Sequence, residues 1–163
     1  MMEPRSARDS EVDALAHLWY AGWQDTHAAI LPVELARLRT LDSFRDRLSA
    51  NIRNVRVAGS SSQPLGFCML KADELYQLYV APAARGSGIA AVLLNDGEAW
   101  LKSRGVQTAW LACAIGNDRA ARFYQKNGWN RVGNMLLQVE TTDGDFPLEV
   151  WRYEKDLVRA SHQ

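Results

Sequence analysis

The segment VAPAARGSGIAAVLL, residues 80–94, carries the strongest structural signal in this chain. It is typical of a strand end, followed by a short loop that contains Arg85, Gly86 and Gly88, and then by an apolar helix. Glycine weakens a helix, yet both glycines lie where the helix should begin. Either the loop follows an unusual path, or a ligand comes close to its backbone.

The start of this helix has the properties of an anion site. The first N–H groups of a helix have no partner within it, and the helix dipole is positive at that end. Glycines let a phosphate approach without a side chain in the way, and an arginine adds a charged fork. A tight turn that needs positive φ is the simpler alternative. We predict a phosphate cradle formed by Arg85, Gly86, Ser87 and Gly88.

Two other phosphate-binding motifs fit this loop less well. A P-loop ends in Gly-Lys-Ser/Thr, and residues 88–90 are Gly-Ile-Ala. Residues 86–91 match the dinucleotide-binding pattern G-x-G-x-x-A. That motif, however, follows its strand almost directly and needs an acidic residue about 20 positions later. Residues 81–85 intervene here and the region around Val106 has no acid, so a Rossmann protein remains the weaker alternative.

The apolar pattern predicts helices and strands in a mixed order. We expect helices over residues 11–23, 33–52 with a break near 40–42, 88–103 and 119–126, and strands over residues 55–58, 65–70, 75–80, 108–115, 131–140 and 148–154. No repeat or linker interrupts this order. The predicted fold class is therefore mixed α/β (α+β-like), with residues 1–163 as a single domain.

Helix ends are expected at several capping residues. Ser10 is the expected cap of the first helix and Asp42 that of the second half of the broken helix. Gly105 is expected to end helix 88–103. The Asp143-Gly144 pair marks a turn between the last two strands, with a connection longer than a minimal hairpin.

Two strands carry predictions about which face each side chain occupies. Strict alternation in strand 75–80 places Leu75 on the same face as Gln77 and Tyr79. Strand 108–115 is apolar on both faces, which is typical of a central strand buried on both sides.

Composition and charge exclude several classes of function. The 19 Lys and Arg residues equal the 19 Asp and Glu residues, so no basic excess indicates a nucleic-acid partner. No run approaches the roughly 18 apolar residues of a membrane span, and residues 1–8 lack the apolar core of a signal peptide. We predict no membrane association and a cytoplasmic location. Cys68 and Cys113 lie in apolar runs without a Cys/His cluster, so we expect buried thiols and no metal site.

A second unusual segment, GNDRAARFYQKNGW, covers residues 116–129. Asn117 lies between a strand and a helix, where it or Asp118 would cap the helix. Arg119, with the other basic residues of this helix, is expected to face solvent. Tyr124 by its position alone would be a packing residue.

Together the two segments resemble the GNAT superfamily, the acetyl-CoA-dependent N-acetyltransferases. The first resembles that family's strand end and its Arg/Gln-x-x-Gly-x-Gly/Ala helix start, through Val80, Pro82, Arg85, Gly88 and Ala90. The second resembles the family's strand ending in Asn and its Phe-Tyr-x-x-x-Gly-Phe/Trp helix, through Asn117, Phe123, Tyr124, Gly128 and Trp129. Residues 19–32 also resemble the substrate-side opening segment of many members.

The resemblance implies a fold and a cofactor site. It implies a central, mostly antiparallel sheet with a splayed strand pair and helices on both faces. Acetyl-CoA would place its pyrophosphate on the loop at residues 85–90 and its pantetheine arm beside Leu78, Tyr79 and Val80, with Asn117 on the other wall. A backbone N–H near Leu78 or Tyr79 would stabilise charge on the carbonyl oxygen. Tyr124 would act as general acid toward the leaving thiolate.

The general base and the acceptor follow less directly from the resemblance. Glu74, at a strand start, is the first candidate for the base, with Asp73 beside it and His27 as a second candidate. The implied reaction is direct attack of a primary amine, from a small molecule or a peptide, on acetyl-CoA in a ternary complex. A non-catalytic acyl-CoA sensor is the alternative, and many relatives are homodimers.

Overall fold

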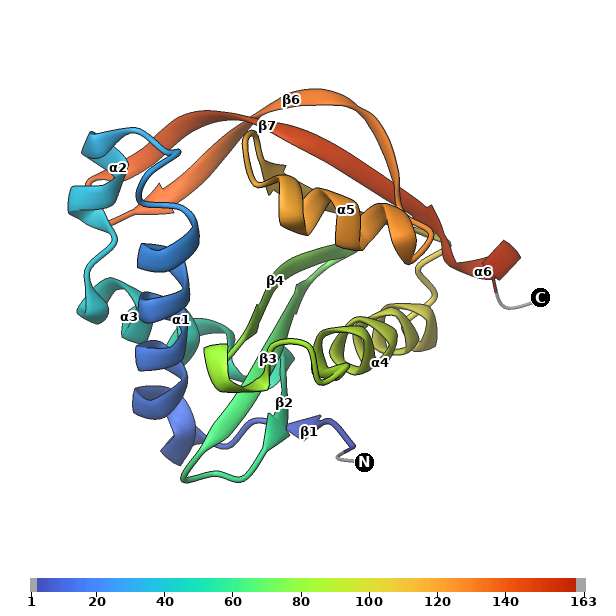
Figure 1. Cartoon of the computed structure of the whole chain (residues 1–163), viewed down its shortest axis with the longest axis horizontal. Coiled ribbons are helices and arrows are strands. Elements are labelled where there is room, and N and C mark those ends of the chain that lie inside the picture. The colour runs from blue at the N-terminus through green and yellow to red at the C-terminus, as the bar shows by residue number, and fades with distance from the viewer. Residues whose placement is uncertain (1–2, 161–163) are drawn as a thin grey trace.

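The computed structural model describes residues 3–160 and has a seven-stranded sheet with helices on both faces (Figure 1). The strand order is β1-β2-β3-β4-β5-β7-β6. Every neighbouring pair is antiparallel except β4 and β5, which are parallel. The predicted mixed α/β class and the mostly antiparallel sheet are confirmed.

The elements follow one another in nearly the expected order. The strands are β1 (Arg5–Ser6), β2 (Val55–Gly59), β3 (Pro64–Lys71), β4 (Glu74–Val80), β5 (Thr108–Ala114), β6 (Asn130–Thr141) and β7 (Gly144–Asp156). The helices are α1 (Val12–Thr26), α2 (Val33–Leu38), α3 (Leu41–Asn51), α4 (Ile89–Ser103), α5 (Asp118–Lys126) and α6 (Leu157–Ala160), with short 3-10 turns at Asp9–Glu11, Ile52–Asn54 and Pro82–Ala84. Strand β1 had no signal in the sequence, because only two residues pair.

The sheet separates two apolar cores. On one face, α1 and α3 pack on β2 and β3 through side chains such as Trp19, Phe44 and Phe67. On the other face, α4 and α5 pack on β3, β4, β5 and β7 (Figure 1). Helix α4 lies very close to β3 because Gly97 has no side chain, and a Cβ there would lie 2.8 Å from the Cys68 sulfur. The close packing holds the start of α4 beside the end of β4.

A β-bulge in β4 overturns the alternation expected for residues 75–80. Leu70 pairs with Leu75 while Met69 pairs with Gln77, so Tyr76 has no partner in β3. The extra residue moves Leu75 to the α4 face, where it packs with Leu78, and leaves Tyr76 on the α1 face. Periodicity cannot signal such an insertion, because a single bulged residue leaves the apolar pattern of the strand almost unchanged.

Strands β4 and β5 separate after their first residues. Their only ladder pair is Glu74 with Trp110, whereas β5 pairs with β7 along its whole length. Strand β5 is central in the sheet, between β4 and β7, as its apolar residues predicted, but only one of its faces is fully buried. Ala109 and Leu111 enter the core, but Ala112 and Ala114 on the opposite face line cavities. Small side chains on that face leave space where a helix would otherwise pack.

Three local predictions at helix and strand ends are corrected. Ser10 caps nothing, because residues Asp9–Glu11 form a 3-10 turn before α1. Thr40, not Asp42, caps α3 by accepting a hydrogen bond from Ser43 N at 3.1 Å. Strands β6 and β7 are joined by residues 142–143 alone, so the connection is shorter than expected. Gly105 follows the end of α4 with a φ of 84°, as its sequence position predicted.

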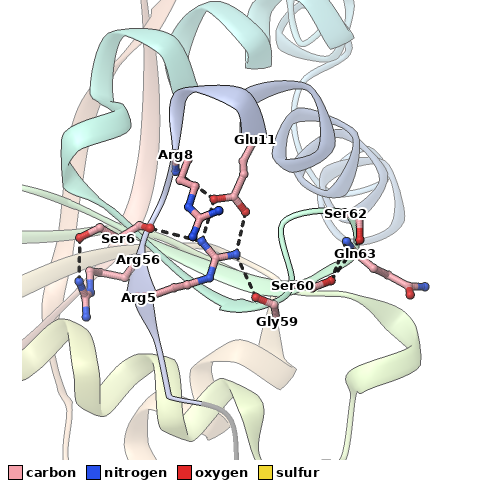
Figure 2. Close-up of polar contacts among 9 residues, drawn as sticks. All are labelled: Arg5, Ser6, Arg8, Glu11, Arg56, Gly59, Ser60, Ser62 and Gln63. Atoms are coloured by element: carbon pink, nitrogen blue, oxygen red, sulfur yellow. Dashed lines mark hydrogen bonds and ion pairs between the residues drawn. The ribbon is translucent and has the colours of Figure 1, made fainter.

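An ion pair attaches the N-terminal strand to α1 (Figure 2). The Arg5 guanidinium donates two hydrogen bonds to the Glu11 carboxylate, at 2.8 and 2.9 Å, and a third to the Gly59 carbonyl at 3.0 Å. Glu11 is 1% exposed and also accepts a hydrogen bond from Arg8 N. The hydrogen bonds from Arg5 lower the pKa of Glu11 below its usual range, against the opposing effect of burial.

We expect the Arg5→Met variant to lower the free energy of unfolding by about 2–3 kcal/mol at pH 7, because it leaves a buried carboxylate with only the Arg8 amide. Urea unfolding measures the change. The lowered pKa means that the stabilisation is present above about pH 4.5 and is lost as the pH falls through the folded-state pKa of Glu11. The loss in the variant should therefore shrink in acid. The double variant Arg5→Met/Glu11→Gln is the control, and an equal loss there would contradict the role of the unpaired charge.

Candidate functional site

A cavity of about 350 Å³ opens where β4 and β5 separate. Its walls come from β4, β5, α5, the end of α1 and the loop that precedes α4. Leu78, Val80, Ala112 and Tyr124 are among the lining residues. The volume is in the range of pockets that bind small molecules and cofactors.

Backbone groups of β4 face this cavity. Ala81 N donates to Leu65 O on the β3 side. Hydrogen-bonded and non-bonded positions alternate along an antiparallel pair, so Tyr79 also faces β3, while the N–H and C=O of Leu78 and Val80 face β5. No ladder pair joins β4 to β5 at this level in residues 3–160. Of the two donors considered from the sequence, the Leu78 amide is thus the one directed into the split.

The loop before α4 has the backbone form that its glycines suggested. Gly86 and Gly88 have φ values of 78° and 89°, which favour glycine. No side chain caps α4, and the Ser87 hydroxyl donates to the Ala84 carbonyl instead. Within the described chain, no acceptor is hydrogen-bonded to the backbone N–H groups of Gly86, Gly88, Ile89 and Ala90. These donors remain available to an anion.

Arg85 lies at the rim of this loop and forms an ion pair across it. Its Nη2 lies 2.9 Å from Asp25 Oδ2 near the end of α1. Both side chains are partly exposed, so the pair is weak and can exchange for a stronger anion. The sequence pattern contained no signal for this contact.

Helix α5 presents Asn117 and Tyr124 to the same cavity. The Asn117 side chain caps α5 by accepting from Ala120 N at 3.3 Å, which leaves its amide NH₂ group to serve as a donor. The Tyr124 ring packs against Phe123, Trp129 and Tyr153. No hydrogen bond joins its hydroxyl to another described residue, and burial raises its pKa, so it stays protonated at neutral pH.

A second cavity of about 180 Å³ lies on the other side of the split. Six residues line both cavities: His27, Tyr76, Gln77, Tyr79, Ala112 and Ala114. Glu74 lines the second cavity and is 8% exposed. The pKa of Glu74 is raised to about 7, chiefly by burial; Asp73 contributes to the rise, while Lys71 and Arg152 oppose it. A carboxyl with this pKa can gain or lose a proton near neutral pH.

His27 lies at the end of α1, between the two cavities. Its Nδ1 and the Tyr79 hydroxyl share a hydrogen bond of 3.1 Å. Burial lowers the pKa of His27 to about 4, so the imidazole is neutral at pH 7 and a weaker proton acceptor than Glu74.

The structure brings most of the predicted site residues together. Nine line the first cavity: Leu78, Tyr79, Val80, Arg85, Gly86, Gly88, Ala90, Asn117 and Tyr124. Glu74 lines the second cavity but not the first, and Ser87 and Ile89 line neither cavity. Arg119 lines the first cavity, although the sequence placed it on a solvated face. Sequence reasoning missed Arg39 and Arg47, which line the second cavity, because nothing local distinguishes them from surface arginines.

Two further kinds of feature, a cluster of metal-ligating side chains and a helix able to span a membrane, are absent from residues 3–160. No group of three or more His, Cys, Asp or Glu side chains is placed to hold a metal ion in that range. None of the helices described there is long and apolar enough to cross a membrane.

Sequence comparison connects residues 13–129 with one family model, described as the acetyltransferase (GNAT) family. An uncharacterized N-acetyltransferase of Mycobacterium tuberculosis is 33% identical over 101 residues, which are 59% of this chain and 65% of that protein. The [ribosomal protein bS18]-alanine N-acetyltransferase of Haemophilus influenzae is 38% identical over 77 residues, 44% of this chain and 51% of that protein. This chain therefore covers somewhat less than two thirds of the mycobacterial protein.

Solved structures share the fold over nearly the whole chain. A GCN5-related N-acetyltransferase from Rhodopseudomonas palustris superimposes with a TM-score of 0.75 at 20% identity, covering 96% of both chains. The PaiA N-acetyltransferase of Thermoplasma acidophilum, solved in complex with coenzyme A, has a TM-score of 0.72 at 21% identity, covering 96% of this chain and 99% of that one. At these identities the likeness establishes the fold and no more.

Proposed function

Because the chain belongs to the GNAT family of acetyltransferases, we propose that it is an N-acetyltransferase that moves the acetyl group of acetyl-CoA to a primary amine of a small molecule or peptide. One observation carries the proposal: two cavities share walls where β4 and β5 separate, so that two substrates can meet there from opposite sides. Direct attack of the amine in a ternary complex fits this arrangement, because it requires both substrates to be held at once.

The first cavity suits acetyl-CoA, which would supply a thioester whose carbonyl carbon accepts the amine. The free amides of Gly86, Gly88, Ile89 and Ala90 would bind its diphosphate, and Arg85 would exchange Asp25 for it. Leu78, Tyr79 and Val80 would line the pantetheine arm, with Asn117 on the opposite wall. The open backbone groups of β4 would bond the amides of that arm as a further strand would.

Two groups of the chain would stabilise charge as the acetyl group moves. The Leu78 amide, directed into the split, would donate a hydrogen bond to the carbonyl oxygen. The Tyr124 hydroxyl, protonated and without a partner, would donate its proton to the departing sulfur. The new C–N bond then replaces the C–S bond, and the leaving thiolate becomes a thiol.

Glu74 would receive the proton that the amine loses. It lines the second cavity, and its pKa of about 7 makes its carboxylate both abundant and basic at physiological pH. His27 lies at the boundary of the cavities, but its pKa of about 4 makes it a poorer base. We place the proton on Glu74, directly or through one water.

We expect Glu74→Gln to lower kcat by about 100-fold or more, because general-base catalysis contributes this much. The wild-type kcat/KM should rise with pH through about 7 as Glu74 ionises. Ionisation of the amine substrate also changes kcat/KM with pH, but it does so equally for the wild type and the variant. The ratio of the two pH profiles therefore shows the ionisation of Glu74 alone. A ratio that does not change with pH would remove Glu74 from the role of base.

The same variant tests the raised pKa through stability. A carboxyl whose folded-state pKa rises from 4.5 to about 7 stabilises the fold most below pH 4.5 and loses that contribution as the pH rises through 7. We expect Glu74→Gln to be more stable than the wild type at pH 8, by at most about 3 kcal/mol, and to lose this advantage in acid. Thermal unfolding at several pH values measures the difference.

The decisive experiment is a thiol-release assay with acetyl-CoA against amino acids, polyamines, aminoglycosides and peptides, together with calorimetric binding of coenzyme A. Release of thiol with one class of amine supports the enzyme. Tight binding of acetyl-CoA without transfer to any amine would favour a sensor module. Binding of NADH without acetyl-CoA would favour a dinucleotide-binding protein.

Three expectations about the whole molecule remain proposals. We infer a single domain over residues 1–163, in support of which one sheet connects both cores. A homodimer follows only from the resemblance, and light scattering at two concentrations tests it. A cytoplasmic location likewise stays a prediction.

A further inference from the structure

Two arginines line the second cavity. Arg39 follows α2, is 4% exposed, and donates from Nη1 to the Glu140 carbonyl at 2.7 Å. Arg47 extends from α3, donates from Nη2 to the Tyr76 hydroxyl at 2.6 Å, and lies 4.4 Å from the ring centre of Trp19. The Nε of Arg47 is buried without any hydrogen-bond partner.

Neither arginine is in direct contact with a carboxylate of residues 3–160, and Glu140 acts on both only at longer range. Among residues 3–160, no carboxylate oxygen forms an ion pair with Arg39 or Arg47. The cavity contains two acidic side chains. The Glu140 carboxylate bonds Lys71 at 3.0 Å, and Glu74 is partly protonated at neutral pH. Burial, together with the charge of Arg47, lowers the pKa of Arg39 to about 10. The cavity therefore has an excess of positive charge.

Burying a cation without an anionic partner costs free energy, and an anionic ligand that pairs with the cation offsets that cost. Arginine suits a carboxylate, because its planar fork presents paired donors to both oxygens. We propose that the acceptor amine also carries a carboxylate, which Arg39 and Arg47 bind in the second cavity. This inference deepens the proposed acetyl transfer and rests on it.

The shape of the cavity restricts the acceptor further. A volume of about 180 Å³ suits a molecule about as large as a single amino acid. The arginines and Glu74 line the same space, so a short molecule can place its carboxylate at the arginines and its amine toward Glu74 and the split. Trp23, Leu35 and Val139 add apolar walls for an aliphatic or aromatic side chain. The acceptor is accordingly a small amino acid rather than a neutral amine or polyamine.

The test compares amines that differ only in charge at the carboxyl. Thiol release from acetyl-CoA is measured with L-amino acids and with the matching neutral carboxamides, for the wild type and for Arg39→Met. We expect Arg39→Met to lower kcat/KM for the favoured amino acid by about 30-fold or more, because a buried charge pair is lost. Activity with the carboxamide should change by less than about 3-fold. Comparison of variants cancels the different basicities of the two amines.

Two further variants control for fold and for charge in general. Arg37→Met removes an exposed arginine of α2 that lines neither cavity, and should leave both activities unchanged. Arg47→Met should repeat the selective loss through a different element. Calorimetric binding of coenzyme A at the first cavity, which neither arginine lines, verifies that each variant is folded.

The failures of the two proposals are distinguishable. The carboxylate site is overturned, while acetyl transfer stands, if Arg39→Met loses kcat/KM equally with the amino acid and with its carboxamide. A wild-type preference for carboxamides or for peptide amines would overturn it in the same way. If no amine is acetylated, the proposed enzyme fails. In that case, calorimetry measures the binding of amino acids to the complex of the protein with coenzyme A. If no amino acid binds, or if Arg39→Met binds it as tightly as the wild type, the carboxylate site is overturned.

Discussion

The Tyr124→Phe variant should bind acetyl-CoA with nearly wild-type affinity and turn it over at least about 100-fold more slowly. The Tyr124 side chain lines the first cavity, and its phenol is protonated at neutral pH, so it can donate a hydrogen bond to the departing sulfur. Phenylalanine retains the ring contacts with Phe123, Trp129 and Tyr153, so the wall of the cavity should not change. Only the proton donor is removed.

Steady-state kcat and calorimetric binding of acetyl-CoA separate these two effects. Tyr20→Phe is the matched control, because it removes a phenol that lines neither cavity. A kcat within about 3-fold of the wild type in Tyr124→Phe would mean that the thiolate leaves without protonation by this residue. A parallel loss of binding would indicate a packing role instead.

The second large effect is expected from Ala90→Asp at the start of α4. Ala90 lines the first cavity at the second position of the helix, where a carboxylate would face the bound diphosphate. Two like charges about 5 Å apart in a partly exposed site repel by about 3 kcal/mol. We expect the KM for acetyl-CoA to rise by about 100-fold relative to Ala90→Asn, which has the same size without the charge.

The fold should not suffer from the added charge. A carboxylate in the first turn interacts favourably with the helix dipole, so Ala90→Asp should melt no lower than Ala90→Asn. The difference in KM between the two variants should shrink with added NaCl, because salt screens exposed charges. Equal KM values for both variants would show that the diphosphate lies elsewhere.

Segments dominated by local interactions were predicted well. Helix α4 begins one residue after Gly88 and ends at Ser103, and α5 begins directly after Asn117, as the sequence indicated. Capping, positive φ and apolar periodicity depend on residues a few positions apart, so they can be recognised in the sequence. The two motif segments that resemble the GNAT family are of this kind. They also carry the loop that we assign to the diphosphate.

The features of the second cavity, which we propose for the acceptor amine, cannot be recognised in the local sequence. The bulge at Tyr76 arises from strand pairing, which no nearby pattern encodes. The split between β4 and β5 was implied by the family resemblance, but it too depends on how distant strands pair. Arg39 and Arg47 share a cavity only because α2, α3 and β6 converge there. The sequence alone therefore determined the family, the order of elements and the cofactor loop. Tertiary packing determined the charge and the size of the second cavity and the raised pKa of Glu74, because burial and pairing depend on residues that are far apart along the chain.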